Sequence, residues 1–328
     1  MIFVTGGTGL VGRHVLLELR DRGIPTTALA RTPAAAESVR QSGAVPFEGS
    51  VEDPALWSRV GDCSAIIHCA AVITSRAPWE HFRQVNVEST RLAADRARRL
   101  GIPLIHLSSV AVYSGDDRAG PEGSLDESRA MGPLDDKASY PRSKRLAETV
   151  LWDASEAGLK ALALRPCLIY GEGDRQFLPR LLRIARKGWL PLIGDGDRPL
   201  SLVHARNVAH AAAEALVLDR GWGRAYNVVN EDSITSRELL TIIATEMNRP
   251  IRTVRIPYPL AIGMARVGDV ILKALLPELI ATGPSGAIRY WRGGNPFNTA
   301  ALRSDLAWVP PVRHREGIPL AVRAAMSG

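Results

Sequence analysis

The stretch "IFVTGGTGLVG" (residues 2–12) decides the fold of this chain. A short apolar run leads into Gly6, Gly9 and Gly12, spaced three apart, and then into a segment with helical periodicity that ends at Gly23. Glycine permits a tight turn, close approach of the backbone to a pyrophosphate, and close packing of helix on sheet. The helix start would add unpaired N–H groups and the positive end of its dipole. The stretch therefore predicts a dinucleotide-binding turn, the alternative being an incidental tight turn.

Strands and helices are predicted to alternate along the first half of the chain. Strand-like apolar runs occupy residues 24–31, 44–50, 64–71, 102–113 and 160–171, and helical segments occupy 33–43, 54–61, 85–101 and the residues from Tyr140 onward. This alternation indicates an α/β fold, a doubly wound parallel sheet (Rossmann fold) with helices on both faces.

The pattern loosens beyond residue 171, where short elements contain Pro, Gly and Trp. We therefore expect a dinucleotide-binding domain over residues 1–165, to which parts of 188–230 return. Residues 166–328 are expected to form mainly a smaller, interleaved C-terminal lobe that binds the substrate.

Composition and charge narrow the class of protein. The 328 residues are 46% hydrophobic and 23% charged, the usual balance of a soluble globular protein. The net charge of +7 invites a nucleic-acid interpretation, but the arginines are scattered and aromatic residues make up only 5%. A protein that binds single strands interleaves aromatic and basic residues along a groove. We expect a basic, solvated surface and no nucleic-acid partner.

The cysteines and the chain start indicate the compartment. Cys63, Cys69 and Cys167 are spaced like no zinc or redox motif. So few cysteines suit a reducing cytoplasm, and we expect a cytoplasmic protein with no metal. Because a strand-like run begins at residue 2, we expect no signal peptide.

The longest apolar stretch covers residues 257–280 and is too interrupted for an integral membrane span. Arg266, Asp269 and Lys273 break it at intervals that predict an amphipathic helix. We expect core for most of its apolar positions and an apolar pocket for a few, with peripheral membrane contact as the alternative. The positions are Pro257, Tyr258, Leu260, Ile262, Met264, Val267, Ile271 and Leu275.

The end of the second predicted strand indicates the form of the cofactor. A carboxylate there would hydrogen-bond the ribose hydroxyls of NAD. This chain has Ala30 at that position, followed by Arg31. Because an arginine pairs well with a 2′-phosphate and stacks on adenine, we expect NADP(H) to be preferred, with NAD(H) as the alternative. Arg31 as a plain surface residue is the other interpretation.

A tyrosine and a lysine share one helix face in "ASYPRSKRLAE" (residues 138–148). Tyr140 and Lys144 are four residues apart, so their side chains are neighbours near the predicted helix start. Ser108 and Ser109 end the fifth predicted strand. Ligands of an open parallel sheet bind beyond the carboxyl ends of its strands, so the serines and the Tyr–Lys pair are candidates for one site.

These motifs together resemble the extended short-chain dehydrogenase/reductases of the NAD-dependent epimerase/dehydratase superfamily. "TGGTGLVG", "SSVAVY" and "YPRSK" resemble the family's glycine loop, serine motif and YxxxK motif, in the family's order. The segments "HCAA" (68–71), "QVNVEST" (84–90) and "LRPCLIYGEGD" (164–174) resemble further family signatures. The resemblance covers essentially the whole chain.

The resemblance implies a role for each matching residue. Ser109 matches the catalytic serine, Tyr140 the proton donor or acceptor, and Lys144 the lysine that holds the nicotinamide ribose and lowers the tyrosine pKa. Asn86 lies in the segment that carries a supporting asparagine in some members. A free tyrosine has a pKa near 10, and a nearby ammonium and the positive nicotinamide ring favour its phenolate.

The resemblance also implies a set of cofactor contacts spread over residues 6–169. The implied residues are Gly6, Thr8, Gly9, Leu10, Val11, Gly12, Arg31, Ser50, Val51, Ala70, Ala71, Ser108, Tyr140, Lys144, Pro166 and Ile169. At Ser50 this chain departs from relatives that carry Asp near the adenine.

The type of reaction follows from what the motifs contain. Dehydration needs an extra acid and base after the catalytic hydroxyl, and this chain has Val110 and Ala111 there. Leu168 stands in a segment where sugar-nucleotide epimerases usually carry asparagine. The segments "RNVAHAAAEAL" (206–216), "RIPYPLAIGMA" (255–265) and "FNTAALRSDLAWVPPV" (297–312) instead resemble the 3β-hydroxysteroid dehydrogenase branch.

We therefore expect a hydride transfer between a nicotinamide and a secondary alcohol or ketone, on an apolar, steroid- or lipid-like substrate. A nucleotide-sugar epimerase of the same fold and an NADP-sensing regulatory protein are the alternatives. The family implies a homodimer through helices near 86–100 and 140–155. The polar segment 114–138 joins Ser109 to Tyr140, and we hypothesise that it gates the substrate.

Overall fold

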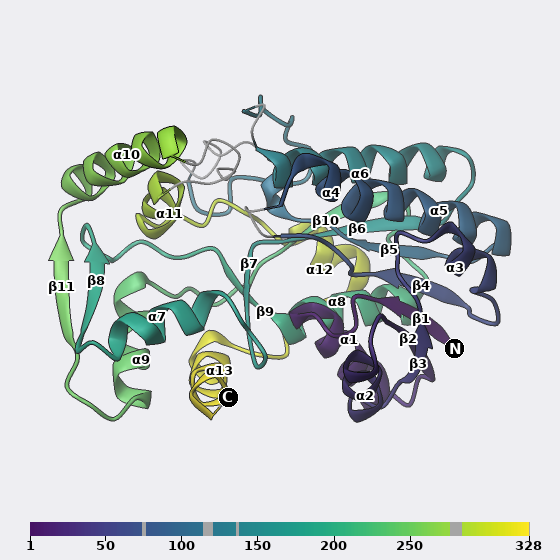
Figure 1. Ribbon diagram of the computed structural model, residues 1–328, viewed down its shortest axis with the longest axis horizontal. Helices are drawn as coiled ribbons and strands as arrows, with labels where there is room; N and C mark the ends of the chain where they lie inside the picture. Colours follow the sequence, from purple (N-terminus) through teal and green to yellow (C-terminus); the bar gives the residue numbers. More distant parts are fainter. Residues whose placement is uncertain (74–76, 114–120, 136–137, 276–283, 328) are drawn as a thin grey trace.

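A sheet of seven parallel strands forms the centre of the larger part of the molecule (Figure 1). The computed structural model describes residues 1–73, 77–113, 121–135, 138–275 and 284–327. The strands are β1 (Ile2–Thr5), β2 (Thr26–Ala30), β3 (Val45–Glu48), β4 (Ala65–His68), β5 (Leu104–Leu107), β6 (Ala161–Pro166) and β10 (Arg224–Val228). Their order is β10-β6-β5-β4-β1-β2-β3. The order reverses between β1 and β4, which is where ligands bind in open α/β sheets.

Helices cover both faces of this sheet, which confirms the predicted doubly wound α/β fold. One face packs against α1 (Leu10–Asp21), α2 (Pro33–Gln41), α8 (Ala205–Leu218) and α12 (Ala300–Leu306). The other packs against α3 (Pro54–Arg59), α5 (Ser89–Leu100) and α6 (Ser139–Glu156). Strands β1, β2, β4 and β6 are buried at every position because apolar helix faces cover them on both sides.

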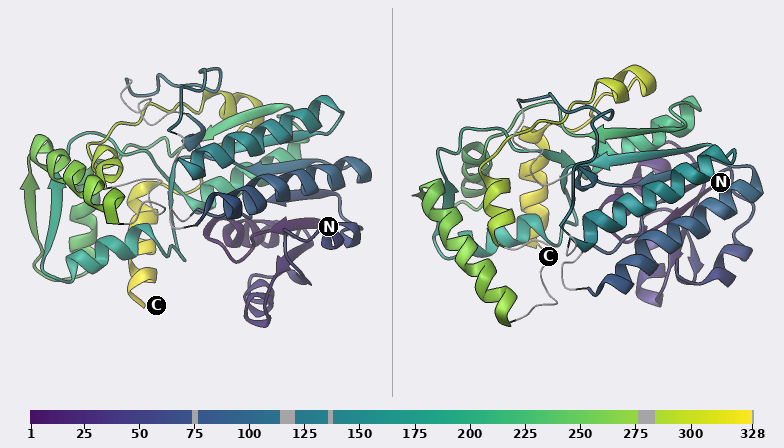
Figure 2. Two further views of the ribbon diagram at one scale, coloured as in Figure 1. Left: turned by 45° about the horizontal axis from the view of Figure 1, so that its top comes forward. Right: turned by 90° about the horizontal axis from the view of Figure 1, so that it is seen from above.

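A smaller lobe with its own core lies at one end of the sheet (Figure 2). It contains α7 (Phe177–Ala185), β8 (Trp189–Ile193), α9 (Ser236–Glu246), β11 (Arg252–Ile256), α10 (Tyr258–Leu275), α11 (Pro284–Trp291) and α13 (His314–Ser327), with β8 and β11 paired. Strands β7 (Leu168–Tyr170) and β9 (Leu202–His204) form a second small parallel pair. The two parts are interleaved, because α8 and β10 return to the large sheet after β8 has joined the smaller lobe.

Three predicted elements are divided in the structure. The predicted strand 102–113 ends at Leu107, and Val110–Val112 form a short 3₁₀ turn, η2. The predicted strand 160–171 becomes β6 and β7 in different sheets, because Pro166 has no N–H to extend the β6 ladder and Leu168 N–H bonds instead to the Ser201 carbonyl. The predicted helix 85–101 begins as a π-helical turn, η1 (Arg83–Glu88), between α4 (Trp79–Phe82) and α5.

The expectation that most apolar positions of 257–280 are core is wrong for the part that the structure describes. Within α10, Ile262 is buried, whereas Leu260, Met264, Val267 and Ile271 are exposed. The helix lies at the outside of the smaller lobe and packs on α11 along one side only (Figure 1). Residues 276–280 lie outside the described ranges.

Candidate active site

The glycine loop joins β1 to the start of α1 through a turn that admits no other residue at two positions. Gly6 has φ +68°, and a Cβ on it would lie 2.7 Å from the Ala70 nitrogen. A Cβ on Gly12 would lie 2.1 Å from the Gly6 carbonyl oxygen. Gly9 is exposed, and a Cβ there would approach the Gly6 carbonyl oxygen at 3.2 Å. The turn is therefore tightly packed where it faces the sheet, whereas its backbone at the α1 N-terminus is accessible to a ligand.

The α1 N-terminus fits the pyrophosphate of a dinucleotide. Gly9 is the residue before the helix, and the first turn of α1 carries no acidic side chain. Thr8 and Leu10 are partly exposed beside Gly9, whereas the Val11 side chain is buried in the core, so Val11 can offer its backbone only. The first N–H groups of a helix and its dipole favour an anion at this position.

The loop after β4 forms the other wall of the same crevice. The Thr5 hydroxyl accepts a hydrogen bond from Ala70 N–H at 3.2 Å and lies 2.9 Å from His68 Nδ1. Ala70 and Ala71 are partly exposed. This contact fixes the ends of β1 and β4 side by side, at the reversal of strand order.

The adenine end of the predicted cofactor site contains Arg31, Ser50 and Val51. Arg31 is exposed directly after β2, where no acidic side chain competes for ribose hydroxyls. The Ser50 hydroxyl donates to Glu52 at 3.2 Å. Val51 is buried, and its carbonyl accepts a hydrogen bond from the Trp57 indole at 2.9 Å. Val51 therefore shapes this corner by packing.

Ser109, Tyr140 and Lys144 come together beyond the carboxyl end of β5. Ser109 precedes the η2 turn, and its Oγ accepts a hydrogen bond from Ala111 N–H at 3.1 Å. Its hydroxyl also lies close enough to the Tyr140 side chain to lower the pKa of the phenol. Tyr140 is in the first turn of α6, and Lys144 follows one turn later, 2% exposed. The lysine Nζ donates to the Leu107 carbonyl oxygen at 2.6 Å, so it reaches from α6 to the end of β5.

The pKa values at this site are set first by burial. Burial raises the pKa of Tyr140 above 10, and the neighbouring Ser109 hydroxyl opposes that rise. Burial lowers the pKa of Lys144 to about 8, while Cys69 and Glu148 act against that decrease. The lowered tyrosine pKa stays a prediction for the cofactor-bound enzyme, where a positive nicotinamide ring would add the charge that favours the phenolate.

Asn86 supports this site through contacts within the protein. It lies in the π-helical turn η1 and is 1% exposed. Its amide nitrogen donates to the Val72 carbonyl at 3.0 Å and to Ser143 Oγ at 2.9 Å, and its amide oxygen accepts from Val72 N–H at 2.7 Å. Ser143 Oγ in turn donates to the Tyr140 carbonyl at 2.8 Å. Asn86 thus connects the loop after β4 to the first turn of α6, which is a positioning role.

A buried ion pair behind the site was not predicted from the sequence. Arg165 on β6 donates two hydrogen bonds to Glu148 on α6, at 2.9 and 2.6 Å, and the two side chains are 5% and 1% exposed. Ser108 Oγ donates to the same carboxylate at 2.5 Å. The signal was present, because Glu148 follows Lys144 by four residues and therefore occupies the same helix face.

The ion pair continues into a polar network that reaches the described part of the polar segment. Arg165 donates to the Tyr113 hydroxyl at 2.8 Å, and that hydroxyl donates to the Asn227 side chain at 3.0 Å. Asn227 N–H then donates to Glu127 at 2.6 Å. Glu127 is thus held at the end of β10. The gate is hypothesised for 114–138, of which 114–120 and 136–137 lie outside the described residues.

Burial holds four histidines in the neutral form. Burial lowers the pKa of His14 to about 4, of His68 to about 3, of His314 to about 4, and of His106 well below 6.5. Both ring nitrogens of His106 are buried with no hydrogen-bond partner among the described residues.

The buried histidines predict a loss of stability in mild acid. The unfolded chain takes up their protons near pH 6.5 and the folded chain only near pH 4 or below, so stability rises with pH across this window. We expect the free energy of unfolding to fall by at least about 3 kcal/mol between pH 7 and 4.5, measured by urea unfolding. His14→Asn should flatten the profile and exposed His81→Asn should leave it unchanged. An equal free energy at both pH values would contradict the prediction.

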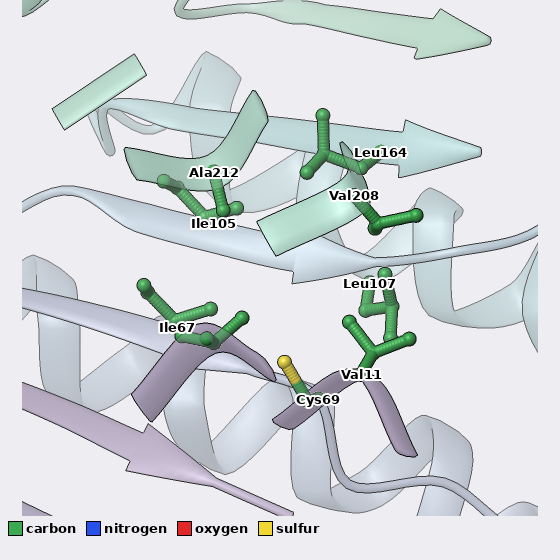
Figure 3. Close-up of a pocket in the computed structure, with 9 residues that line it drawn as sticks. Val11, Ile67, Cys69, Ile105, Leu107, Leu164, Val208 and Ala212 are labelled. Carbon is green, nitrogen blue, oxygen red and sulfur yellow. The ribbon is translucent and has the colours of Figure 1, made fainter. Parts of the chain in front are cut away.

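An apolar gap lies on the α1 and α8 side of the sheet, beneath the glycine loop (Figure 3). Figure 3 shows the Cys69 sulfur pointing among Val11, Ile67 and Leu107. The gap is lined by apolar groups and holds no space for a water molecule. It is therefore a packing gap in the core and not a substrate pocket.

Two predicted cofactor contacts remain, Pro166 and Ile169. Pro166 is buried at the end of β6, and Ile169 is partly exposed on β7.

The described ranges contain no cluster of three or more His, Cys, Asp or Glu side chains that could hold a metal ion. Hydroxyl, phenol and ammonium groups come together beside the crevice. The fold and these groups define a Rossmann-fold enzyme with a Ser–Tyr–Lys site.

The chain belongs to the NAD dependent epimerase/dehydratase family, whose model matches residues 2–228. It is 31% identical, over 99% of this chain and 97% of the relative, to 4-hydroxy-2-methyl-3-oxo-4-farnesyl-3,4-dihydroquinoline-1-oxide ketoreductase of Stigmatella aurantiaca. It is 30% identical, over 97% of each chain, to 2-alkyl-3-oxoalkanoate reductase of Stenotrophomonas maltophilia (strain K279a). It is 29% identical, over 84% of this chain and 76% of the relative, to the decarboxylating sterol-4-alpha-carboxylate 3-dehydrogenase of Mus musculus.

Among solved structures, UDP-glucuronic acid 4-epimerase from Bacillus cereus, in complex with UDP-glucuronic acid and NAD, is similar in fold. Its TM-score is 0.75 at 14% identity, covering 99% of both chains. The predicted class is confirmed: this chain is an enzyme of an NAD-dependent family whose named relatives act on keto and hydroxyl groups.

Proposed function

We propose that this protein is a reductase or dehydrogenase that exchanges a hydride between NADP(H) and a secondary alcohol or ketone. The observation that carries the proposal is the placement of Ser109 beside Tyr140, with Lys144 one helical turn away. A bound nicotinamide would supply or accept the hydride. The chain itself has to supply a proton at the substrate oxygen and to stabilise the charge that develops there.

The three side chains have separate tasks in this proposal. Tyr140 donates its phenolic proton to the carbonyl oxygen during reduction, or takes the alcohol proton during oxidation. Ser109 donates a hydrogen bond to the same oxygen as negative charge develops on it. Lys144, buried and held at the Leu107 carbonyl one helical turn from Tyr140, would supply positive charge to the site and a donor for a ribose hydroxyl.

Two observations support a redox reaction on an apolar substrate. Val110 and Ala111 follow Ser109, so the chain lacks the acid and base that a dehydratase places there, which argues against dehydration. The ketoreductase and reductase named above match this chain over nearly its full length, and their names specify a farnesylated quinoline oxide and alkyl oxoalkanoates. A nucleotide-sugar epimerase stays the alternative, and Leu168 in place of an asparagine argues against it.

A substrate panel tests the proposed function. Purified protein would be mixed with NADPH or NADH and with bulky apolar ketones or UDP-sugars, and cofactor absorbance followed in the near ultraviolet. NADPH should be consumed with the apolar ketones. Conversion of a UDP-sugar without consumption of cofactor, together with no reaction on ketones, would replace the reductase by an epimerase.

Arg31 supports a preference for NADP(H) over NAD(H). Its guanidinium is exposed after β2, where it can pair with a 2′-phosphate. We expect Arg31→Asp to weaken NADPH binding by about tenfold or more and to strengthen NADH binding, because a charge-assisted hydrogen bond contributes about 1.5–3 kcal/mol. Cofactor titration by fluorescence measures both, with exposed Arg40→Asp as the matched control. If Arg31→Asp bound NADPH as tightly as the wild type, Arg31 would be a plain surface residue without a contact to the 2′-phosphate.

We further propose that two chains pair through α5 and α6. A surface groove of about 320 Å³ lies between these helices and is lined by Ala94, Ala154 and Ala157 together with Val150 and charged side chains. Small residues allow helices of a second chain to approach closely. Leu146 lies on the same face of α6 and is exposed.

The dimer predicts a change of mass on one substitution. The 35.5 kDa chain should sediment at twice that mass, and Leu146→Glu should yield the single chain. Val45→Glu, on the exposed edge strand β3, should leave the mass of the dimer unchanged. Wild-type protein that sediments as a single chain would contradict the proposed dimer.

The three free cysteines support a reducing, cytoplasmic location.

A further inference from the structure

Helix α10 carries a stripe of large apolar side chains that face solvent. Leu260, Met264, Val267 and Ile271 are 56%, 66%, 59% and 51% exposed, and Val270 is 66% exposed beside them. Their spacing of four, three and four residues places them along one side of the helix. Exposed apolar residues scattered singly are normal, whereas a contiguous patch on one element marks an interaction surface.

The opposite side of α10 is already packed. Ala261, Ile262 and Ala265 are buried, and Pro284 of α11 lies 3.6 Å from where a Cβ on Gly268 would stand. Asp269 faces the same side and accepts a hydrogen bond from Ser285 N–H at 3.4 Å. The helix is therefore fixed on the lobe by one face, and the apolar stripe is the face left over.

Most of the charged side chains described near the stripe are basic. Arg266 lies between the stripe and the packed side, and it is exposed. Arg292 stacks over the Tyr258 ring at 4.7 Å, at the start of α10, and Arg289 and Arg255 are exposed on the neighbouring elements. The acidic residue of α10, Asp269, is turned to α11, so the outward face of α10 is apolar and basic.

We propose that α10 lies on a lipid bilayer that carries anionic headgroups. Its apolar stripe enters the boundary of headgroups and acyl chains, and the flanking arginines meet the phosphates. A second copy of this chain fits less well, because pairing two stripes would bring the basic flanks of both copies together. No helix among the described residues is long and apolar enough to cross a membrane, so α10 lies along the surface.

The docked orientation would place the active site near the bilayer. Figures 1 and 2 show α10 on the same side of the molecule as α6, whose first turn holds Tyr140. An apolar ketone dissolved in the bilayer would then have a short way to the site. This consequence rests on the proposed reductase function, whereas the docking itself does not.

Vesicle co-sedimentation of the full chain tests the docking without cofactor or substrate, so its result is independent of turnover. We expect sedimentation with vesicles of phosphatidylcholine and phosphatidylglycerol, and weaker binding in high salt and to phosphatidylcholine alone. The triple variant Leu260→Gln, Met264→Gln, Val267→Gln should bind about tenfold or more weakly, because three apolar side chains no longer leave water. Arg266→Gln should reduce the binding to the anionic vesicles.

The matched control removes as many exposed apolar side chains elsewhere. Val45→Gln, Val217→Gln, Val309→Gln should bind vesicles like the wild type. Thermal unfolding confirms that both triple variants fold. Absence of wild-type binding to the anionic vesicles would overturn the proposal, as would an equal loss in both triple variants. Loss of self-association in the α10 variant, without any vesicle binding by the wild type, would assign the stripe to a second copy.

Discussion

Tyr140→Phe is expected to lower kcat by about 10³-fold and to leave the dissociation constant of NADPH within about threefold. The substitution removes the phenolic hydroxyl beside Ser109 and keeps the ring in the first turn of α6. Since the proton then has to come from water, the barrier for transfer to the substrate oxygen rises, while the cofactor contacts of the glycine loop are untouched. Steady-state kinetics and a cofactor titration measure the two quantities.

The same variant separates an enzyme from a regulatory protein that only senses cofactor. A regulatory protein that only senses the cofactor would bind NADPH and show no turnover, in the wild type as well as in Tyr140→Phe. Tyr258→Phe removes a phenol from the smaller lobe and serves as the matched control, with kcat within about twofold of wild type. Wild-type kcat in Tyr140→Phe would contradict the assignment of the proton donor.

Glu148→Ala is expected to lower the free energy of unfolding by about 3–5 kcal/mol. The change leaves the Arg165 guanidinium buried without its carboxylate, and it also removes the acceptor of the Ser108 hydrogen bond. An uncompensated buried charge costs more than the loss of an exposed pair, because the guanidinium cannot regain water. Urea unfolding at pH 7 measures the difference.

Two further variants identify the cause of that loss. Replacing both partners by methionine should recover most of the stability, since a buried ion pair and a packed apolar pair of similar volume are often equivalent. Asp197→Ala breaks the exposed pair with Arg237 and should cost less than about 1 kcal/mol. If Glu148→Ala cost no more than Asp197→Ala, the buried network would not stabilise the fold.

Much of the site could be predicted because local sequence sets it. The glycines after β1 form a local turn, and Tyr140 and Lys144 share a helix face by spacing alone. That Ser109 reaches Tyr140 follows from topology, because both are expected beyond the carboxyl ends of parallel strands. The positions of these residues therefore follow from the order of strands and helices along the chain and do not depend on exact packing.

Other features could not be predicted because they depend on how distant elements pack. Arg165 on β6 meets Glu148 on α6 only once the helix lies on the sheet, and the helical spacing that places Glu148 on the face of Lys144 does not identify Arg165 as its partner. The division of 160–171 depends on whether β7 pairs with β9, a strand more than thirty residues later. The apolar residues of α10 are predicted from the sequence to be buried in the core, and most of them are exposed. Hydrophobic periodicity identifies an apolar helix face, but it does not show whether another part of the protein covers that face.

Isotope transfer tests the central claim of hydride exchange most directly. NADPH deuterated at the transferable position of C4 would be incubated with the protein and an apolar ketone from the panel, and the product analysed by mass spectrometry. The account predicts one deuterium at the carbinol carbon for each NADPH consumed, and none with Tyr140→Phe on the same timescale. A converted substrate without deuterium, with the cofactor unconsumed, would contradict it.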